Sequence, residues 1–491
     1  MIKEISVKSK IKSGFVYAIL SFLLLTGWSL ASPPGSSPDE DLHLSSVWYI
    51  KMYPNVKYPE HPLRDDKIPL RITDAGKCYF KDPNTTSICE TNTFLSNPNY
   101  SRIVNNSKYY AFLSKFVSPT KIDISTLRIR IVNALVASIA LFVVVLLTPR
   151  TTSLPVLISW LIVNIPLGFF ILSSVNPSSW SYIFSYLFLP LIYKVFSKDR
   201  SPNSIAISLL VLVSAFLLAQ EARFDILLFA IIFTTSLLPI IFNYEDMNTR
   251  FKTLINLSAL LIASGVTFAI WNRSFLVNFR EMKTSNWENL TGVSSLITGA
   301  FGGWGLGSLE TTMPAITFVV SFVTVLSIIF IALRKIDISE LFSFALLSFF
   351  VFIVPLLVLI RSNLRVGEWL QPRYILPIFY VLLALSLLVV FKALTTRKLM
   401  IFINFIFLMS TITFMTALHT VYRRYTVGLD NYSLLFIEPN SWWWDFNHLP
   451  SPIIVYIFTV FIFIIFWLFL RKDFLAESRL GSSNEFEQKR N

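Results

Sequence analysis

The chain has 491 residues, of which 54% are hydrophobic and only 14% are charged, and its mean hydropathy is +0.62. This composition excludes a soluble globular protein, since such a protein would need a more polar surface. The formal net charge is +13. The distribution of basic residues along the chain explains most of this charge without a nucleic-acid partner.

Apolar runs of roughly 20 residues, each long enough to cross a bilayer, recur along the chain. We predict about twelve of them, at 14–31, 127–147, 153–173, 178–195, 204–220, 224–242, 253–271, 312–333, 338–360, 374–394, 398–418 and 452–470. The pattern predicts an all-α, multi-pass membrane protein. Its parts are a basic segment with the first helix (1–31), a large first loop (32–126), a multispanning domain (127–470) and a polar tail (471–491).

The first apolar run has two interpretations. Lys3, Lys8, Lys10 and Lys12 precede it, and Ser29-Leu30-Ala31 resembles a signal-peptide cleavage site. The run from 14 to 31 is longer than a usual signal-peptide core, which favours an uncleaved signal-anchor helix over a cleaved signal.

Basic residues set the predicted orientation, because cytoplasmic loops carry an excess of Lys and Arg. With the N-terminus inside, every inner segment is basic, and the tail is cytoplasmic as well. This orientation predicts a plasma-membrane protein whose outer segments are 32–126, 173–179, 220–225, 272–311, 361–373 and 419–451.

The first outer loop contains both cysteines of the chain, Cys78 and Cys89. Two cysteines in one outward loop predict a disulfide formed in an oxidising compartment. Two unrelated buried thiols are the alternative.

An acidic segment, Pro38-Asp39-Glu40-Asp41-Leu42-His43, follows the first apolar run. Helix capping explains much of it, with Ser37 as N-cap, Pro38 at the first helical position and Glu40 closing a capping box. The following helix is expected to present Leu44, Val47, Trp48 and Lys51 as an interfacial amphipathic face. Capping leaves unexplained why Asp39 and His43 lie on one side of this helix beside the membrane exit. We therefore predict that the segment has a function as well as a cap.

Arginines in the outer segments depart from the positive-inside pattern. Arg223 lies in a short turn with Glu221 and Asp225, so a structural ion pair and a functional role are both open. Arg365, Arg373, Arg423 and Arg424 lie in longer outer segments. Arginine at headgroup depth suits a phosphate, which the guanidinium group binds through two hydrogen bonds. Contact with lipid headgroups is the alternative.

Five glycines cluster between Gly299 and Gly307 in another outer segment. No strand precedes them and the spacing of a dinucleotide-binding loop is absent, so we predict a flexible or re-entrant loop. The chain also lacks the H-E-x-x-H and G-x-S-x-G motifs, so zinc hydrolysis and serine catalysis have no support.

Three short motifs carry a resemblance to a known family. The segment from Pro38 to His43 resembles the P-D-E-x-x-H signature of an uncharacterised bacterial membrane family. That family is placed in the GT-C superfamily of polyprenyl-phosphate-sugar-dependent glycosyltransferases. Ser174-Val175-Asn176-Pro177-Ser178 and Gln371-Pro372-Arg373-Tyr374-Ile375-Leu376-Pro377 also match. Protein O-mannosyltransferases of the same superfamily similarly have an Asp-Glu pair in the first outer loop. Asp41, a third acid, and the central region depart from the family pattern.

The resemblance implies a GT-C-like fold, a lipid-linked sugar donor, an outward-facing site and Asp39 as the catalytic acid or base. The residues themselves suit an inverting transfer, which needs a carboxylate to accept the proton of the acceptor and a cation to stabilise the departing phosphate. Asp39 or Glu40 is the predicted base. The predicted substrate-binding residues are His43, Asn176, Arg223, Arg365, Gln371, Arg373, Tyr374, Arg423 and Arg424. A divalent metal held by Asp39, Glu40 and His43 is a further hypothesis.

The acceptor is expected to be a cell-envelope glycan, a lipid or a protein, and membrane lipids surround the site. A polysaccharide polymerase or ligase that uses a lipid-pyrophosphate-linked glycan is the first alternative, since it would also need outward arginines. A transporter is less favoured, because the chain shows neither repeat symmetry nor ionisable residues in the middle of its spans.

Overall fold

The computed structural model describes residues 7–54, 68–89, 108–196, 201–223, 225–242, 249–272, 286–307, 309–362, 366, 370–432, 434, 442–444 and 449–488. Within these ranges the regular structure is helical, with two isolated β-bridges as the exceptions. The helices are α1 (Val7–Leu30), α2 (Glu40–Met52), α3 (Leu70–Thr73), α5 (Lys108–Ser114), α6 (Ile122–Leu147), α7 (Arg150–Val163), α8 (Leu167–Leu172), α9 (Ser178–Val195), α10 (Pro202–Ala222), α11 (Ile226–Ile241), α12 (Thr249–Asn272), α13 (Asn286–Gly292), α14 (Ser295–Ala300), α15 (Ala315–Leu333), α16 (Ile338–Ser362), α17 (Pro372–Ala393), α18 (Thr396–Thr426) and α19 (Pro452–Gln488).

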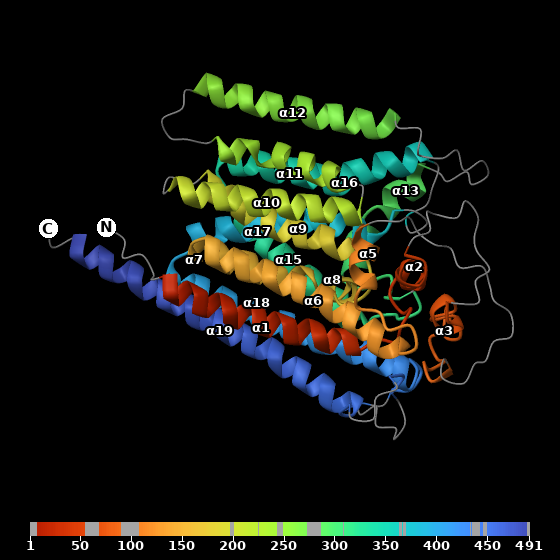
Figure 1. The fold of residues 1–491 in the computed structure, drawn as a ribbon. Helices are drawn as coiled ribbons and strands as arrows, with labels where there is room; N and C mark the ends of the chain where they lie inside the picture. Colours follow the sequence, from red (N-terminus) through yellow and green to blue (C-terminus); the bar gives the residue numbers. More distant parts are fainter. Residues whose placement is uncertain are drawn as a thin grey trace.

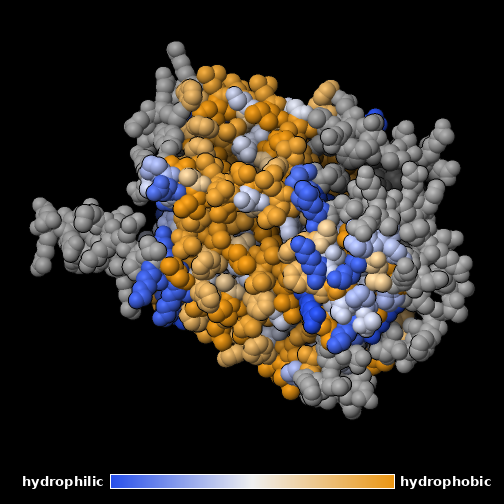
Figure 2. Space-filling model, viewed as in Figure 1, coloured by the Kyte–Doolittle hydropathy of each residue, from blue (hydrophilic) through white to orange (hydrophobic). Residues whose placement is uncertain are grey.

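Long apolar helices confirm the predicted fold class, an all-α multi-pass membrane protein. Nine helices in the described ranges are long and apolar enough to cross a bilayer. They coincide with predicted runs, whereas the runs at 153–173, 178–195 and 224–242 form shorter or more polar helices. Figure 2 shows the corresponding surface, a broad hydrophobic band with hydrophilic residues gathered along both of its borders.

The run at 153–173 is not one helix, as predicted, but two. α7 ends at Val163 and α8 begins at Leu167. Pro166 explains the break, because proline has no N–H to donate and disfavours helical geometry in the residue before it. The short α8 then leads directly into the Ser174–Ser178 motif at the end of the bundle.

α17 forms the centre of the bundle, packed against α7, α9, α15 and α16 (Figure 1). In its most apolar stretch 89% of the residues are buried. The corresponding share is 11% for α12, which lies at the edge of the bundle against α11 and α16. The Gln371–Pro377 motif begins this central helix. The position of Arg373 is therefore set by the most enclosed element of the fold.

α2, α3 and α5 cover one end of the bundle, which we call the loop end (Figure 1). α1 begins and α19 ends at the opposite end. The first apolar run is an integral part of the bundle, since α1 packs against α6 and α19. α19 continues through most of the 471–491 tail to Gln488.

The acidic segment differs from the predicted cap in two ways. α2 begins at Glu40 rather than Pro38, because Asp39 has φ 61° and ψ 14°, a left-handed conformation that a helix cannot include. The predicted interfacial face is also wrong, since Leu44, Val47 and Trp48 are fully buried within the protein. α2 packs against α3 and α5 at the loop end.

Candidate functional site

The three motifs that are distant in the sequence meet at the loop end. The turn before α2 brings Asp39, the turn before α9 brings Asn176, and the start of α17 brings Arg373. Asn176 Nδ2 donates to the carbonyl oxygen of Pro38 at 2.9 Å, and Arg373 donates to the same oxygen at 3.2 Å. Two donors from different helices thus hold the backbone immediately before Asp39.

Asp39 and Arg373 form the ion pair at the centre of this cluster. The Nη2 atom of Arg373 lies 2.5 Å from Asp39 Oδ2, and the exposed fractions of the two side chains are 6% and 47%. Arg373 also donates to the hydroxyl of Tyr374 at 3.1 Å. The carboxylate is therefore about half exposed, whereas the guanidinium of its partner is almost fully buried.

The electrostatic surroundings of Asp39 have opposing effects on its pKa. Partial burial raises the pKa, but the charge and hydrogen bond of Arg373 more than compensate, so the pKa lies below its usual value. Asp41 differs, because burial and the neighbouring charge of Asp39 raise its pKa. Two acids of one motif thus have pKa values shifted in opposite directions.

Asp39 also has a strained backbone. A left-handed φ is uncommon for a residue other than glycine, although aspartate tolerates it better than most. Such strain persists only where surrounding contacts enforce it, and it often marks functional sites. Here two hydrogen bonds hold the carbonyl group of Pro38, directly before Asp39.

Glu40, the other predicted base, is sealed inside the protein. Its side chain and that of Arg130 are both fully buried, with 2.6 Å between Oε2 and the Nη2 atom. Backbone N–H groups of Gly35, Ser37 and Val175 also donate to this carboxylate, at 3.1, 3.4 and 2.8 Å. Of the two carboxylates predicted as the base, only that of Asp39 is therefore exposed.

Arg130 completes this second ion pair. All five of its N–H groups are used, two by Glu40 and three by the carbonyl oxygens of Ser29, Ser32 and Pro33. α6 is thereby joined to the end of α1 and to the turn that leads to Asp39. Sequence reasoning missed Arg130, although an arginine within a predicted span was the available signal.

Arg223 forms an ion pair with Asp225, one of the two roles that the sequence analysis considered for it. It binds Asp225 with two nitrogens, at 2.5 to 3.1 Å, and donates to Ser178 Oγ at 2.8 Å. Its guanidinium lies 5.0 Å from the ring centroid of Tyr374, and that of Arg373 lies 5.1 Å from the same centroid. The ring of Tyr374 thus contacts both guanidinium groups, that of Arg373 on α17 and that of Arg223, which follows the end of α10.

His43 lies behind the cluster, only 7% exposed. Its Nδ1 atom is 2.7 Å from the hydroxyl of Tyr110 on α5, and the two rings stack. Burial lowers the pKa of His43 to about 3, and the positive charges of Arg373 and Arg223 act in the same direction, while Asp39 opposes them. His43 is therefore neutral at physiological pH.

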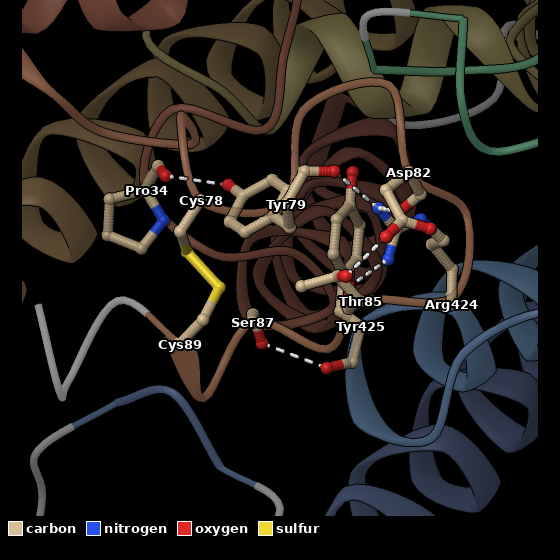
Figure 3. Close-up of a disulfide and its surroundings, with 9 residues drawn as sticks. All are labelled: Pro34, Cys78, Tyr79, Asp82, Thr85, Ser87, Cys89, Arg424 and Tyr425. Atoms are coloured by element: carbon tan, nitrogen blue, oxygen red, sulfur yellow. Dashed lines mark hydrogen bonds between the residues drawn. A yellow bond between two sulfur atoms is a disulfide. The ribbon is translucent and has the colours of Figure 1, made fainter.

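Arg424 does not join this cluster, contrary to the prediction that it binds substrate. It is fully buried and donates to the carbonyl oxygens of Tyr79, Asp82 and Thr85, at 2.7 to 2.9 Å. Figure 3 shows its guanidinium pointing into the loop that contains these residues. Because its guanidinium donates to three backbone carbonyl groups, Arg424 holds a loop and is not placed to bind a phosphate at the Asp39 cluster.

The loop held by Arg424 carries the disulfide between Cys78 and Cys89 (Figure 3). Tyr79 donates to the carbonyl oxygen of Pro34 at 3.0 Å, and Gly35 packs directly on the backbone of Ala75. Gly35 has φ 79°, and an added Cβ would lie 2.6 Å from Ala75. The disulfide loop therefore supports the turn that precedes Asp39.

Three further residues were predicted to bind substrate, namely Arg423, Gln371 and Arg365. Arg423 lies over the ring of Tyr432 at 5.6 Å. Gln371 is the N-cap residue of α17 and lines a cleft beside Arg373. Arg365 is outside the described residues.

The arrangement of Asp39, Glu40 and His43 does not suit the divalent metal site that was hypothesised for them. Glu40 is directed at Arg130, and Asp39 is directed at Arg373. In the described ranges no three His, Cys, Asp or Glu side chains are grouped so that they could hold a metal ion. A site formed by Asp39, Glu40 and His43 is therefore not supported, because two of its three ligands have cationic partners.

Comparison with known families identifies the family of this chain. Residues 22–383 match the model of a family described as predicted membrane protein (DUF2142). The chain belongs to this family. The DUF2142 match starts within α1 and ends within α17, so all three converging motifs lie inside it. No curated protein and no solved structure gives a significant match.

Proposed function

We propose that this DUF2142 protein is a membrane glycosyltransferase that moves a sugar from a polyprenyl-phosphate donor to an acceptor outside the cytoplasm. The acceptor is a cell-envelope glycan, a lipid or a protein. One observation carries the proposal, namely the half-exposed carboxylate of Asp39 placed 2.5 Å from the buried guanidinium of Arg373. A base for the acceptor hydroxyl and a cation for the departing phosphate are the two groups that such a transfer requires.

In the proposed reaction the acceptor hydroxyl approaches the anomeric carbon of the donor sugar. Its proton passes to the Asp39 carboxylate while the new carbon–oxygen bond forms. The bond between the anomeric carbon and the phosphate oxygen breaks, and the electron pair leaves with the phosphate, which Arg373 stabilises. A phosphate is a weakly basic leaving group, so no general acid is obligatory.

The ion pair also suggests how the donor prepares the base. Without a donor, Arg373 lowers the pKa of Asp39. A donor phosphate would share the guanidinium and weaken this effect, so the pKa of Asp39 would rise and its carboxylate would accept a proton more readily. Donor binding would therefore precede acceptor activation.

Both guanidinium groups of the cluster have a carboxylate partner, since Arg373 pairs with Asp39 and Arg223 pairs with Asp225. A polymerase or ligase that uses a lipid-pyrophosphate-linked glycan therefore remains the alternative function.

The test is a transfer assay with purified protein in lipid nanodiscs. The protein is incubated with a panel of radiolabelled polyprenyl-phosphate sugars and membrane extracts as acceptors, and the Asp39→Asn variant serves as the blank. We expect label to leave at least one donor in the wild type and none in the variant. Absence of transfer from every donor, or equal transfer by the variant, would contradict the proposal.

A further inference from the structure

The side chain of Asn176, in the Ser174–Ser178 motif, is enclosed by the protein and only 1% exposed. Its amide group makes two hydrogen bonds. Nδ2 donates to the carbonyl oxygen of Pro38 at 2.9 Å, and Oδ1 accepts from the N–H group of Ser178 at 2.9 Å. Asn176 is therefore placed to act on the backbone of the acidic segment rather than on a substrate.

The carbonyl group of Pro38 lies in the peptide plane that joins this residue to Asp39. The orientation of that plane sets φ of Asp39, because the peptide bond itself is planar and does not rotate freely. Asp39 has φ 61° and ψ 14°, a left-handed conformation that is uncommon for a residue other than glycine. Holding the carbonyl of Pro38 thus holds Asp39 in a conformation that it would otherwise seldom adopt.

Asp39 has a more ordinary alternative as the N-cap residue of α2. An aspartate at this position commonly has an extended backbone, and its carboxylate accepts a hydrogen bond from an N–H group of the first turn, worth about 1 kcal/mol. Here the side chain makes no capping hydrogen bond and is directed at Arg373, with 2.5 Å between Oδ2 and Nη2. Without a hold on Pro38, the carboxylate is free to turn from Arg373 toward the start of α2.

The two donors to the carbonyl of Pro38 differ in their other tasks. Arg373 donates to it at 3.2 Å and also donates to the carboxylate of Asp39. In the proposed reaction this guanidinium stabilises the departing phosphate, so its hydrogen bonds to the acidic segment are the ones that are exchanged. The amide of Asn176 has its other hydrogen bond within its own motif, to Ser178. Asn176 is thus the donor that stays in place when Arg373 binds phosphate.

We infer that Asn176 is a positioning residue, which holds Asp39 in its left-handed conformation while a donor phosphate occupies Arg373. It acts through the carbonyl of Pro38 and does not contact the substrate. Asparagine suits this role because one amide offers an N–H group to Pro38 and an oxygen to Ser178 at the same time. The inference rests on the proposed function, because it assigns the residue that orients the base.

Three variants of the Ser174–Ser178 motif separate positioning from general support of the fold. In Asn176→Ser the hydroxyl can still accept from the N–H group two residues on, as serine does in comparable turns, but it is too short to reach Pro38. Asn176→Asp keeps the size and the acceptor oxygen and lacks the N–H donor. The matched control is Ser174→Ala, which removes the 2.9 Å hydrogen bond to Ser37 Oγ and leaves the one to Pro38 in place.

In the transfer assay, Asn176→Ser and Asn176→Asp should lower the maximal rate about 10- to 100-fold, because the base is displaced from the acceptor. The donor concentration for half-maximal rate should change by less than about twofold, and Ser174→Ala should stay within about twofold of the wild type in both parameters. An unchanged maximal rate in Asn176→Ser, or an equal loss in Ser174→Ala, would overturn the inference. A defect confined to the donor concentration would also overturn it and indicate a donor-binding residue.

Hydrogen exchange of the acidic segment gives a second measurement that needs no sugar donor. The N–H groups of Glu40 and His43 donate to the carbonyl oxygens of Ser37 and Asp39, each at 3.0 Å. In nanodiscs, mass spectrometry should show these N–H groups exchanging at least about threefold faster in Asn176→Ser than in the wild type or Ser174→Ala. Unchanged exchange in Asn176→Ser would overturn the inference.

The two measurements fail separately. Faster exchange in Asn176→Ser, without transfer from any donor to any acceptor by the wild type, would support the hold of Asn176 on the acidic segment and refute the transferase. Transfer at an unchanged maximal rate in Asn176→Ser would refute the positioning role and leave the transferase standing.

Discussion

Two neighbouring carboxylates, Asp39 and Glu40, each pair with an arginine from a distant helix, yet their surroundings are opposite. The Glu40–Arg130 pair is fully buried, and every N–H group of its arginine is used. The Asp39–Arg373 pair has a 47% exposed carboxylate, and its arginine keeps one buried N–H group without a partner in the described ranges. We therefore expect the first pair to hold the fold and the second, with its exposed carboxylate, to be the one that can exchange partners.

The comparison teaches that sequence adjacency does not imply a shared role. Removing one member of a buried pair leaves an uncompensated charge, so the sealed pair should govern stability. The open pair stands at the surface of the bundle and should govern activity. Four predictions separate the two pairs, in order of expected effect.

Asp39→Asn should reduce transfer by about 100- to 10,000-fold, because the amide cannot accept the proton of the acceptor. Asparagine tolerates a left-handed backbone and can still accept a hydrogen bond from Arg373, so the free energy of unfolding should fall less than it does in Glu40→Gln. The measurement is the initial rate of transfer in nanodiscs. Asp41→Asn, the same chemical change two residues away, is the control, and a rate for Asp39→Asn close to that of the control would remove Asp39 from the mechanism.

Glu40→Gln should lower the free energy of unfolding by about 3–5 kcal/mol, because Arg130 would remain buried without a counter-ion. Chemical unfolding in mixed micelles measures this change. The control is Glu221→Gln, which breaks the exposed pair with Lys108 and should cost at most about 1 kcal/mol. Equal effects of the two variants would show that the Glu40 pair is not structural.

Arg373→Lys should weaken donor use by about 1.5–3 kcal/mol, since an ammonium group cannot form the paired hydrogen bonds of a guanidinium. The effect should appear in the donor concentration that gives half-maximal rate. Gln371→Ala should give a smaller defect in the same parameter, and Arg128→Lys, at an exposed position of α6, should give none. Unchanged donor kinetics for Arg373→Lys would assign this arginine to lipid anchoring.

His43 predicts a pH dependence of stability at the open site. Its pKa is about 3 in the folded protein and about 6.5 in an unfolded chain, so the unfolded state binds more protons between these values. Stability should therefore fall as the pH drops below 6.5, by up to about 2 kcal/mol at pH 5. His43→Gln should remove this loss, and a wild-type unfolding curve that is unchanged from pH 6.5 to pH 5 would show that His43 is not buried in the neutral form.

Local patterns predicted much of the fold and part of the site. Apolar runs identified the long helices, because a bilayer imposes a length and composition that can be read directly from residues. Asp39 and Arg373 were both identified as candidates, since carboxylates and arginines are rare in such a chain. The break at Pro166 and the beginning of α2 at Glu40 were not predicted, because both depend on backbone conformation at single residues.

The sequence by itself determined which segments are apolar, which short motifs carry charge and that two cysteines share one loop. Only the tertiary structure decided the roles within the motifs. Glu40 became structural because Arg130 and Val175 reach it from 90 and 135 residues away. Arg424 became structural because three carbonyl groups of the disulfide loop surround it, while Arg373 remained beside an exposed acid. The physical reason is that the reactivity of a charged group depends on its desolvation and on its partners, and both are set by residues that only folding brings together.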